Sequence, residues 1–193
     1  MKLSNSINDN MSPSQIYAEI NRRQITAMML HRELSVMFSF LGLQGFKRWQ
    51  EYRYKKESDE NIKMHFHFID YDNHLIPDMN VEAIHIIPND WYNAENLNVS
   101  ANTKKSYVNR AMLEWQEWEE ETKEVLEHYY MILLKQDKVC DAEYVMCMLK
   151  DTSKELKKLE RCMNKLKLVD FDTVYIAEIQ EELHNKYKKK MGE

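Results

Sequence analysis

Glycine and proline are scarce in this sequence, with three of each among 193 residues. So few turn formers exclude a glycine-rich phosphate loop or a dinucleotide fingerprint, and disfavour most sandwiches and barrels, which need turn chemistry at every short strand. Long apolar runs are missing as well, since none approaches the roughly 18 residues that a membrane span requires. A chain with 44% hydrophobic and 31% charged residues is ordinary for a soluble globular protein, and the scarce punctuation predicts long helices.

The three cysteines, Cys140, Cys147 and Cys162, are an odd number without a metal-finger spacing. We interpret them as reduced, buried thiols of a cytoplasmic protein. The chain carries 27 basic and 32 acidic residues, a net charge of −5. An acidic chain gains nothing from counterion release on a phosphate backbone, so nucleic-acid binding is disfavoured despite the basic run 186–190. That run suits the negative end of a helix dipole.

The domain organisation is predicted to be simple. Residues 1–12 are polar and rich in Asn and Ser, without the apolar stretch of a signal peptide, and we expect a disordered arm. Residues 13–190 have the length of one domain, and we expect a single helical bundle. Ser12 and Pro13 form a typical helix start. Apolar residues at spacings of three, four and seven predict helices over residues 13–41, 45–71, 104–135, 139–166 and 171–188.

Residues 72–103 interrupt this helical pattern. A stretch of that length is too long for a tight connection in a bundle, and a crossover along the outside explains it better. Such a crossover makes the helices before and after it parallel. Its apolar piece is expected to expose Val81, Ile84, Ile86 and Ile87 as a patch for a twofold neighbour, which predicts a homo-oligomer.

The apolar residues of each of the four long helices form a stripe along one face, and each stripe contains polar residues near its middle. A bundle core should be apolar throughout, because a buried charge without a partner costs several kcal/mol. The polar residues are Arg23 and Gln24 in the first helix; Arg53, Lys56, Glu57 and Glu60 in the second; Glu119 and Thr122 in the third; and Thr152 and Glu155 in the fourth. The clustered glutamates need cations between them. Those cations are either metal ions or the basic side chains of the same layer.

Several short segments, in this order, resemble the ferritins. They are 18–24 with Ile20-Asn21, 45–49 with Gly45-Phe46, Pro88-Asn89-Asp90-Trp91, Trp118-Glu119, and Glu155. The resemblance covers roughly residues 15–185. It implies an all-α fold, a ferritin-like four-helix bundle with a long crossover between helices 2 and 3 and a short fifth C-terminal helix.

The resemblance also implies a di-iron carboxylate site with a degenerate ligand set. Its metal ligands would be Glu57, Glu60, Glu119 and Glu155, with Glu57 as the bridge between two irons and Glu119 as a ligand of the second. Three departures weaken this site: Arg23 or Gln24 replaces the first-helix glutamate, Glu60 replaces a histidine, and Thr152 replaces a Gln or Glu. Carboxylate ligands suit iron or manganese.

Two functions remain open. One is a ferritin-like iron-binding protein of the storage or homeostasis type, with a partly degraded site and at most weak ferroxidase activity. The alternative is a metal-free, non-catalytic structural or assembly protein of the same fold. In that case Arg23, Arg53 and Lys56 neutralise the core carboxylates through paired hydrogen bonds.

Overall fold

The computed structural model describes residues 10–72, 74–77, 81, 85–87 and 99–192. Within these ranges the chain forms five α-helices and no β-strand. The helices are α1 (Pro13–Phe40), α2 (Gln44–Asp72), α3 (Ala101–Lys135), α4 (Val139–Leu168) and α5 (Thr173–Met191). The all-α prediction is confirmed, and the helix ends differ from the predicted ones by at most three residues. None of the described helices has the length and apolar character to cross a bilayer.

The three cysteines are free thiols, and Cys162 is buried as predicted. The prediction of burial is wrong for Cys140 and Cys147, which are exposed on α4.

The start of α1 shows why the chain becomes helical at residue 13. Ser12 and Gln15 form a capping box, in which Ser12 Oγ accepts from the Gln15 amide at 3.3 Å and Gln15 Oε1 accepts from the Ser12 amide at 2.8 Å. Met11 is buried, and its carbonyl accepts from Gln136 Nε2 at 2.7 Å. The end of the predicted arm is thus tied to the α3–α4 turn, while residues 1–9 lie outside the described ranges.

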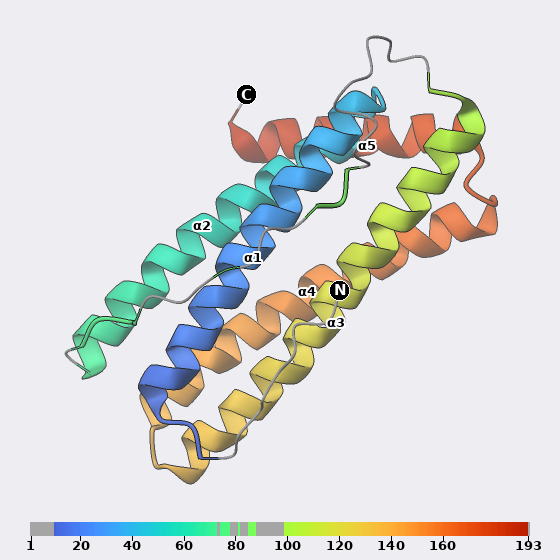
Figure 1. The fold of residues 1–193 in the computed structure, drawn as a ribbon. Coiled ribbons are helices and arrows are strands. Elements are labelled where there is room, and N and C mark those ends of the chain that lie inside the picture. Colours follow the sequence, from blue (N-terminus) through green and yellow to red (C-terminus); the bar gives the residue numbers. More distant parts are fainter. Residues whose placement is uncertain (1–9, 73, 78–80, 82–84, 88–98, 193) are drawn as a thin grey trace.

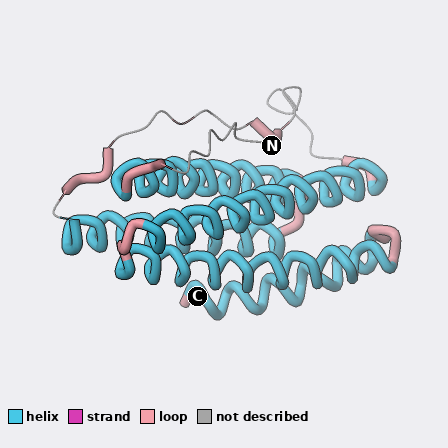
Figure 2. Tube along the Cα trace, turned by 90° about the horizontal axis from the view of Figure 1, so that it is seen from below, coloured by secondary structure: helices cyan, strands magenta, loops and turns pink. Residues whose placement is uncertain are grey.

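The four long helices lie side by side as two antiparallel pairs, α1 with α2 and α3 with α4 (Figures 1 and 2). Each pair is joined by a short turn that contains a left-handed residue, Gly42 at φ 75° and Asp137 at φ 58°. In Figure 1, α2 and α3 run in the same direction. The two helices that the crossover joins are therefore parallel, as the length of the crossover predicts.

The described part of the crossover packs onto the bundle. Ile76, Ile86 and Ile87 are buried against the core, and Val81 is half-buried. The expectation that this segment exposes an apolar patch is therefore wrong for Ile86 and Ile87, because both contribute to the bundle core. Ile84 lies outside the described residues.

The core divides into two apolar clusters with the polar layer between them. One cluster surrounds Trp49 and Trp115, whose ring centroids are 4.6 Å apart in an edge-to-face arrangement. The other surrounds Tyr17 and Phe68, with centroids 4.7 Å apart. This division holds the polar residues at one height in the bundle.

The fifth helix crosses one end of the bundle at a steep angle (Figure 1). Its Tyr187 is fully buried and stacks on Trp49 of α2, with centroids 5.7 Å apart. Nearby, Gly45 of α2 lies directly against the backbone of Gln180, so that a Cβ at position 45 would fall 1.7 Å from the Gln180 carbonyl oxygen. Only glycine allows the two helices to approach this closely.

Gly45→Ala is therefore expected to destabilise the protein, although alanine favours helices by roughly 1 kcal/mol over glycine. The steric overlap with backbone has to be relieved by shifting α5, and overpacking of this kind costs about 1–3 kcal/mol. Urea unfolding followed by circular dichroism measures the change. Asp59→Ala, on the exposed side of the same helix, is the matched control and should change stability by less than about 0.5 kcal/mol. A Gly45→Ala variant as stable as the unsubstituted protein would contradict the close approach.

Candidate functional site

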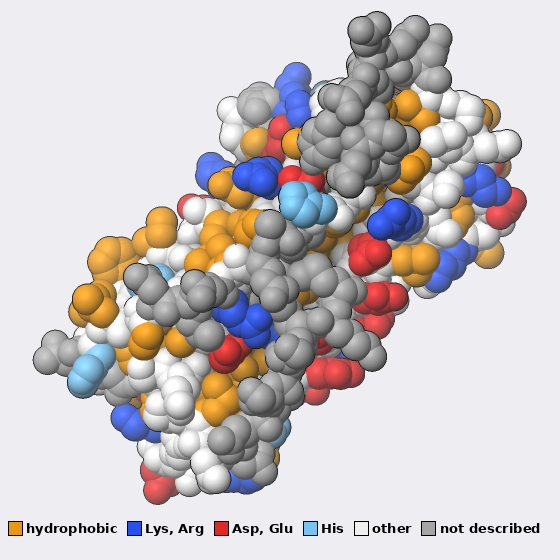
Figure 3. Space-filling model, viewed as in Figure 1, with side chains coloured by type: hydrophobic (Ala, Val, Ile, Leu, Met, Phe, Trp, Pro, Cys, Tyr) orange, Lys and Arg blue, Asp and Glu red, His pale blue; other side chains and the backbone are white. Residues whose placement is uncertain are grey.

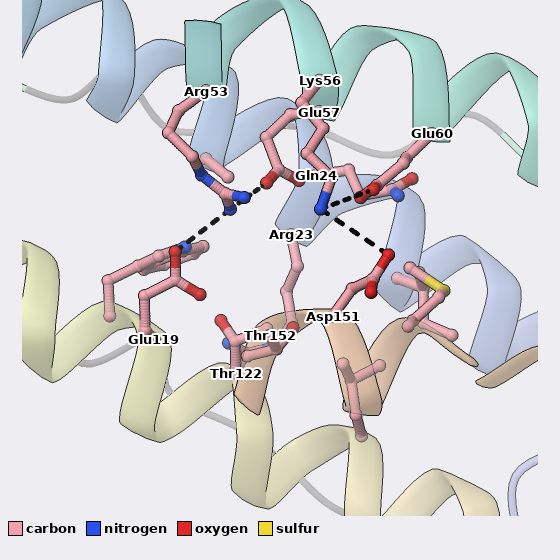
Figure 4. Close-up of a pocket in the computed structure, with 15 residues that line it drawn as sticks. Arg23, Gln24, Arg53, Lys56, Glu57, Glu60, Glu119, Thr122, Asp151 and Thr152 are labelled. Carbon is pink, nitrogen blue, oxygen red and sulfur yellow. Dashed lines mark hydrogen bonds and ion pairs between the residues drawn. The ribbon is translucent and has the colours of Figure 1, made fainter. Parts of the chain in front are cut away.

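The polar layer encloses a cavity at the middle of the bundle (Figure 4). The centres of water molecules have a volume of about 40 Å³ open to them in this cavity. One water needs roughly 10–15 Å³ of such space, so the cavity has room for a few waters or one small ion with part of its hydration. Side chains from all four long helices line it, and the polar ones are Arg23, Gln24, Arg53, Lys56, Glu57, Glu60, Glu119, Thr122, Asp151 and Thr152.

Arg53 of α2 is the central cation of this layer, with 4% of the residue exposed. Its Nη2 donates to Glu57 Oε1, one turn further along α2, and to Glu119 Oε1 of α3 at 3.2 Å. Its Nη1 lies 3.8 Å from Glu155 Oε2 of α4. Figure 4 shows Arg53 reaching out from α2 toward Glu57 and Glu119. One planar guanidinium, with five diverging N–H donors, thereby joins carboxylates from three helices.

Two tryptophans and a lysine complete the shell around these carboxylates. Trp115 Nε1 donates to Glu119 Oε1 at 2.9 Å, and Trp49 Nε1 donates to Glu155 Oε1 at 3.1 Å. Lys158 Nζ donates to Glu155 Oε2 at 2.7 Å from the outer side of α4. These contacts fix the carboxylates, since each buried oxygen named here has a donor.

Lys56 is a second cation, placed between α2 and α4 at the mouth of the cavity. Its Nζ lies 3.1 Å from Glu60 Oε1 and 3.6 Å from Asp151 Oδ2. The side chains of Lys56, Glu60 and Asp151 are 27%, 25% and 41% exposed. This group therefore faces solvent on one side, and its ion pairs are weaker than those of a fully buried cluster.

The α1 side of the cavity carries Arg23 and Gln24. Arg23 Nη2 donates to Glu121 of α3 at 2.9 Å, and its guanidinium lies 5.6 Å from the centre of the Trp118 ring. Gln24 Oε1 accepts from Asn61 Nδ2 at 3.0 Å, while its own Nε2 has no partner among the described residues. The Glu121 side chain is only 17% exposed, so this ion pair is largely buried.

The buried charges shift the pKa values in opposite directions. Burial acts to raise the pKa of Glu155, but Arg53, Lys158 and the Trp49 N–H together lower it to about 2. Burial raises the pKa of Glu57 to about 7, against the opposing effect of Arg53. The pKa of Glu119 is raised as well, by burial, with Arg53 and the Trp115 N–H opposing. One guanidinium does not offset three buried carboxylates, and Glu57 takes up a proton near neutral pH.

The four predicted site residues do not form one group. Glu57, Glu119 and Glu155 converge on Arg53, whereas Glu60 turns to Lys56 and Asp151. The inward positions of Glu57, Glu119 and Glu155 follow from the helical stripes. Asp151 also lines the cavity, although it stands beside the apolar stripe of α4 and not on it. Its position next to Thr152 is the only sign in the sequence that it reaches the polar layer.

A di-iron centre does not fit this donor set. The space between Glu57, Glu119 and Glu155, where an ion would need to sit, is filled by the Arg53 guanidinium. Across the described residues, no three His, Cys, Asp or Glu side chains are arranged to hold a metal ion. The carboxylates that could serve as hard ligands are already engaged by side-chain cations.

We expect Glu57 to make the stability of the protein depend on pH. Because its pKa is raised from 4.5 to about 7, Glu57 is mainly protonated in the folded chain and mainly ionised in the unfolded chain between these two pH values. Its contribution to the free energy of unfolding therefore falls as the pH rises through this window. Glu57→Gln removes that loss, and the stability of the variant relative to the unsubstituted protein should rise by about 2 kcal/mol between about pH 5.5 and 7.5.

Urea unfolding of both proteins at the two pH values measures this difference. The comparison with the unsubstituted protein is needed because burial lowers the pKa of His31 to about 3, so that its contribution grows with pH and opposes that of Glu57. His31 is present in both proteins and cancels from the difference. A difference that stays constant over this pH range would show that Glu57 does not hold the extra proton.

Comparison with known proteins agrees with this architecture. No protein-family model and no curated protein matches the sequence. Among solved structures, the chain is similar to the open-pore ferritin of the archaeon Archaeoglobus fulgidus, with a TM-score of 0.65 and 15% identity over 89% of this chain and 95% of that one. It is similar as well to an engineered closed form of that ferritin, with a TM-score of 0.66 and 16% identity over 93% and 97% of the two chains. The chain therefore has a ferritin-like fold.

Proposed function

We propose that this protein is a metal-free member of the ferritin-like fold, a non-catalytic structural subunit whose core carboxylates are neutralised by its own cations. The observation that carries the proposal is the Arg53 guanidinium, which contacts Glu57, Glu119 and Glu155 from three helices. Lys56 takes a comparable place between Glu60 and Asp151. Two side-chain cations thus stand where two bound ions would otherwise be needed to balance the charge.

The same contacts argue against oxidation of iron by this chain. Two-electron chemistry with oxygen needs two adjacent irons, and the first-helix position that would supply a carboxylate holds Arg23 and Gln24. Displacing a buried guanidinium from its carboxylates would cost several kcal/mol before any metal ligand became available.

Iron or manganese binding at Glu57, Glu60, Glu119 and Glu155, with weak or absent ferroxidase activity, is the second candidate. The cavity favours it, because Glu57, Glu60 and Glu119 all line the same space of about 40 Å³. An ion bound there would sit beside Arg53 and Lys56, whose charges oppose it.

Arg53→Met is expected to destabilise the protein by about 3–5 kcal/mol, because it leaves buried carboxylates without their cation. The variant should bind Mn²⁺, and this binding should raise its melting temperature. Mn²⁺ should leave the melting temperature of the unsubstituted protein unchanged. Thermal unfolding with and without Mn²⁺, together with anaerobic calorimetric titration of Fe²⁺, measures both effects. Arg110→Met, on the exposed side of α3, is the matched control and should change stability by less than about 1 kcal/mol.

The two candidates predict opposite results for the unsubstituted protein and for Glu119→Ala. A metal site predicts that the unsubstituted protein binds Fe²⁺ or Mn²⁺, and that Glu119→Ala lowers this binding without loss of stability, since it relieves carboxylate repulsion. The metal-free proposal predicts no such binding and a destabilised Glu119→Ala variant, since Arg53 and Trp115 lose an acceptor. Rapid oxidation of Fe²⁺ by the purified protein would refute the proposal.

Self-assembly is the second part of the proposal, and it rests on an apolar stripe along α2. Ile62, Phe66 and Ile69 lie at helical spacing and are 54%, 62% and 37% exposed. Figure 3 shows hydrophobic side chains gathered on the left of the molecule, where α2 lies in Figure 1. A stripe on a single helix suits a second copy related by a twofold axis. The similar structures, described as an open-pore ferritin and its closed form, are consistent with an assembly.

Phe66→Glu is expected to dissociate the oligomer, because it places a charge at the centre of the apolar stripe. Light scattering coupled to size exclusion, at micromolar concentration, measures the mass. Lys63→Glu, which alters an exposed charge of the same helix turn, is the comparison variant and should leave the mass unchanged. A monomeric unsubstituted protein would refute the assembly role and leave the metal-free core unaffected.

A further inference from the structure

Lysines of three helices lie around the buried pair of Tyr187 and Trp49, and those of α5 are affected by the charges of the others. Lys158 belongs to this group because it donates to Glu155, which also accepts from Trp49. Lys186 and Lys190 come from α5, Lys158 from α4 and Lys56 from α2. On α5 the spacing of four residues places Lys186 and Lys190 on one face, where like charges repel. We call these four residues the lysine cluster.

Aromatic rings hold the two α5 lysines in place. Lys186 Nζ lies 5.2 Å from the centre of the Tyr187 ring, and Lys190 Nζ lies 5.4 Å from the same ring. Lys190 Nζ is also 4.8 Å from the centre of the Tyr52 ring of α2. Since Tyr187 is fully buried and stacks on Trp49, it anchors both ammonium groups to the bundle. The two charges are therefore positioned before any ligand arrives.

The α5 lysines lack a negative partner. Within the described part of the chain, neither Lys186 nor Lys190 has a carboxylate oxygen within 4.0 Å, although seven other lysines do. Glu155 is the carboxylate that acts on the pKa of both α5 lysines, but it is buried and already contacts Arg53, Trp49 and Lys158. Lys158 is thus paired with Glu155, and Lys56 with Glu60 and Asp151, whereas the charges of the two α5 lysines are not balanced by a carboxylate of the described residues.

The electrostatic effect of this convergence is visible in both α5 lysines. Burial, then Lys190 and Lys158, lower the pKa of Lys186, against Glu155. Burial and Lys158 lower the pKa of Lys190, with Glu155 again opposing and Lys56 adding to the repulsion. A bound anion would offset this repulsion, because it would place negative charge between the ammonium groups.

We propose that the lysine cluster binds an oxyanion of the phosphate class, in which a doubly or more highly charged phosphoryl group bridges Lys158 of α4 to Lys186 and Lys190 of α5. Ammonium groups are compact point charges with three donors each, and they suit phosphoryl oxygens. A singly charged ion would neutralise only one of the lysines. The inference goes beyond the proposed function, because the phosphoryl group would contact Lys158, Lys186 and Lys190. Lys56, which the proposed function pairs with Glu60 and Asp151, only adds to the positive charge.

Inorganic pyrophosphate is the first probe, titrated calorimetrically into the full chain at low ionic strength. Adenosine diphosphate is the second, and it distinguishes a free diphosphate from one carried on a larger molecule. Binding of either one supports the site. In the Lys186→Gln/Lys190→Gln variant the affinity should fall by about tenfold or more. In the Lys186→Arg/Lys190→Arg variant, which keeps both charges, most of the affinity should remain.

Lys188→Gln/Lys189→Gln is the matched control, because it removes the same charge from exposed positions of the same helix turn that lie away from Tyr187. Its affinity should stay within about twofold of the unsubstituted protein. An equal loss in both glutamine variants would overturn the proposal, since it would show attraction to diffuse charge only. Absence of binding at about 10 mM of either probe would overturn it as well. Circular dichroism verifies that each variant keeps its helices.

Discussion

The buried guanidinium of Arg53 is the interaction on which the rest of the structure depends. Three carboxylates from three helices meet at one height of the bundle, and without a cation their repulsion would push the helices apart. The two tryptophan N–H groups that turn toward Glu119 and Glu155 rely on the carboxylates being held there. The apolar clusters above and below can then close around a charged layer, because its buried carboxylates have a cation among them.

Charge balance inside a bundle can be achieved by bound ions or by covalently attached cations, and the two solutions differ in cost. A bound ion must be acquired after or during folding, and its ligands repel one another until it arrives. A guanidinium on the chain is always present and always charged, so the carboxylates are never left bare. The raised pKa of Glu57 shows that the balance is not complete, and a proton supplies the remainder.

The helices of this fold could be predicted from the sequence, since Ser12-Pro13 and the spacing of apolar residues define them locally. The inward positions of Glu57, Glu119 and Glu155 followed from the same spacing. The identity of the central cation could not be predicted in this way, because Arg23, Arg53 and Lys56 occupy similar positions in the apolar stripes of their helices. Only the contacts that each side chain makes in the folded protein distinguish them. The burial of Ile86 and Ile87 likewise depends on packing between distant segments, which no local pattern encodes.

The docking of α5 on α2 places the last helix of the chain over aromatic residues near its beginning. Tyr187 covers Trp49, and both belong to the cluster that closes one end of the bundle. Movement of α5 away from α2 would transfer this large indole from the protein interior to water. The local stability of this end of the bundle therefore depends on a contact between two helices that lie far apart in the sequence.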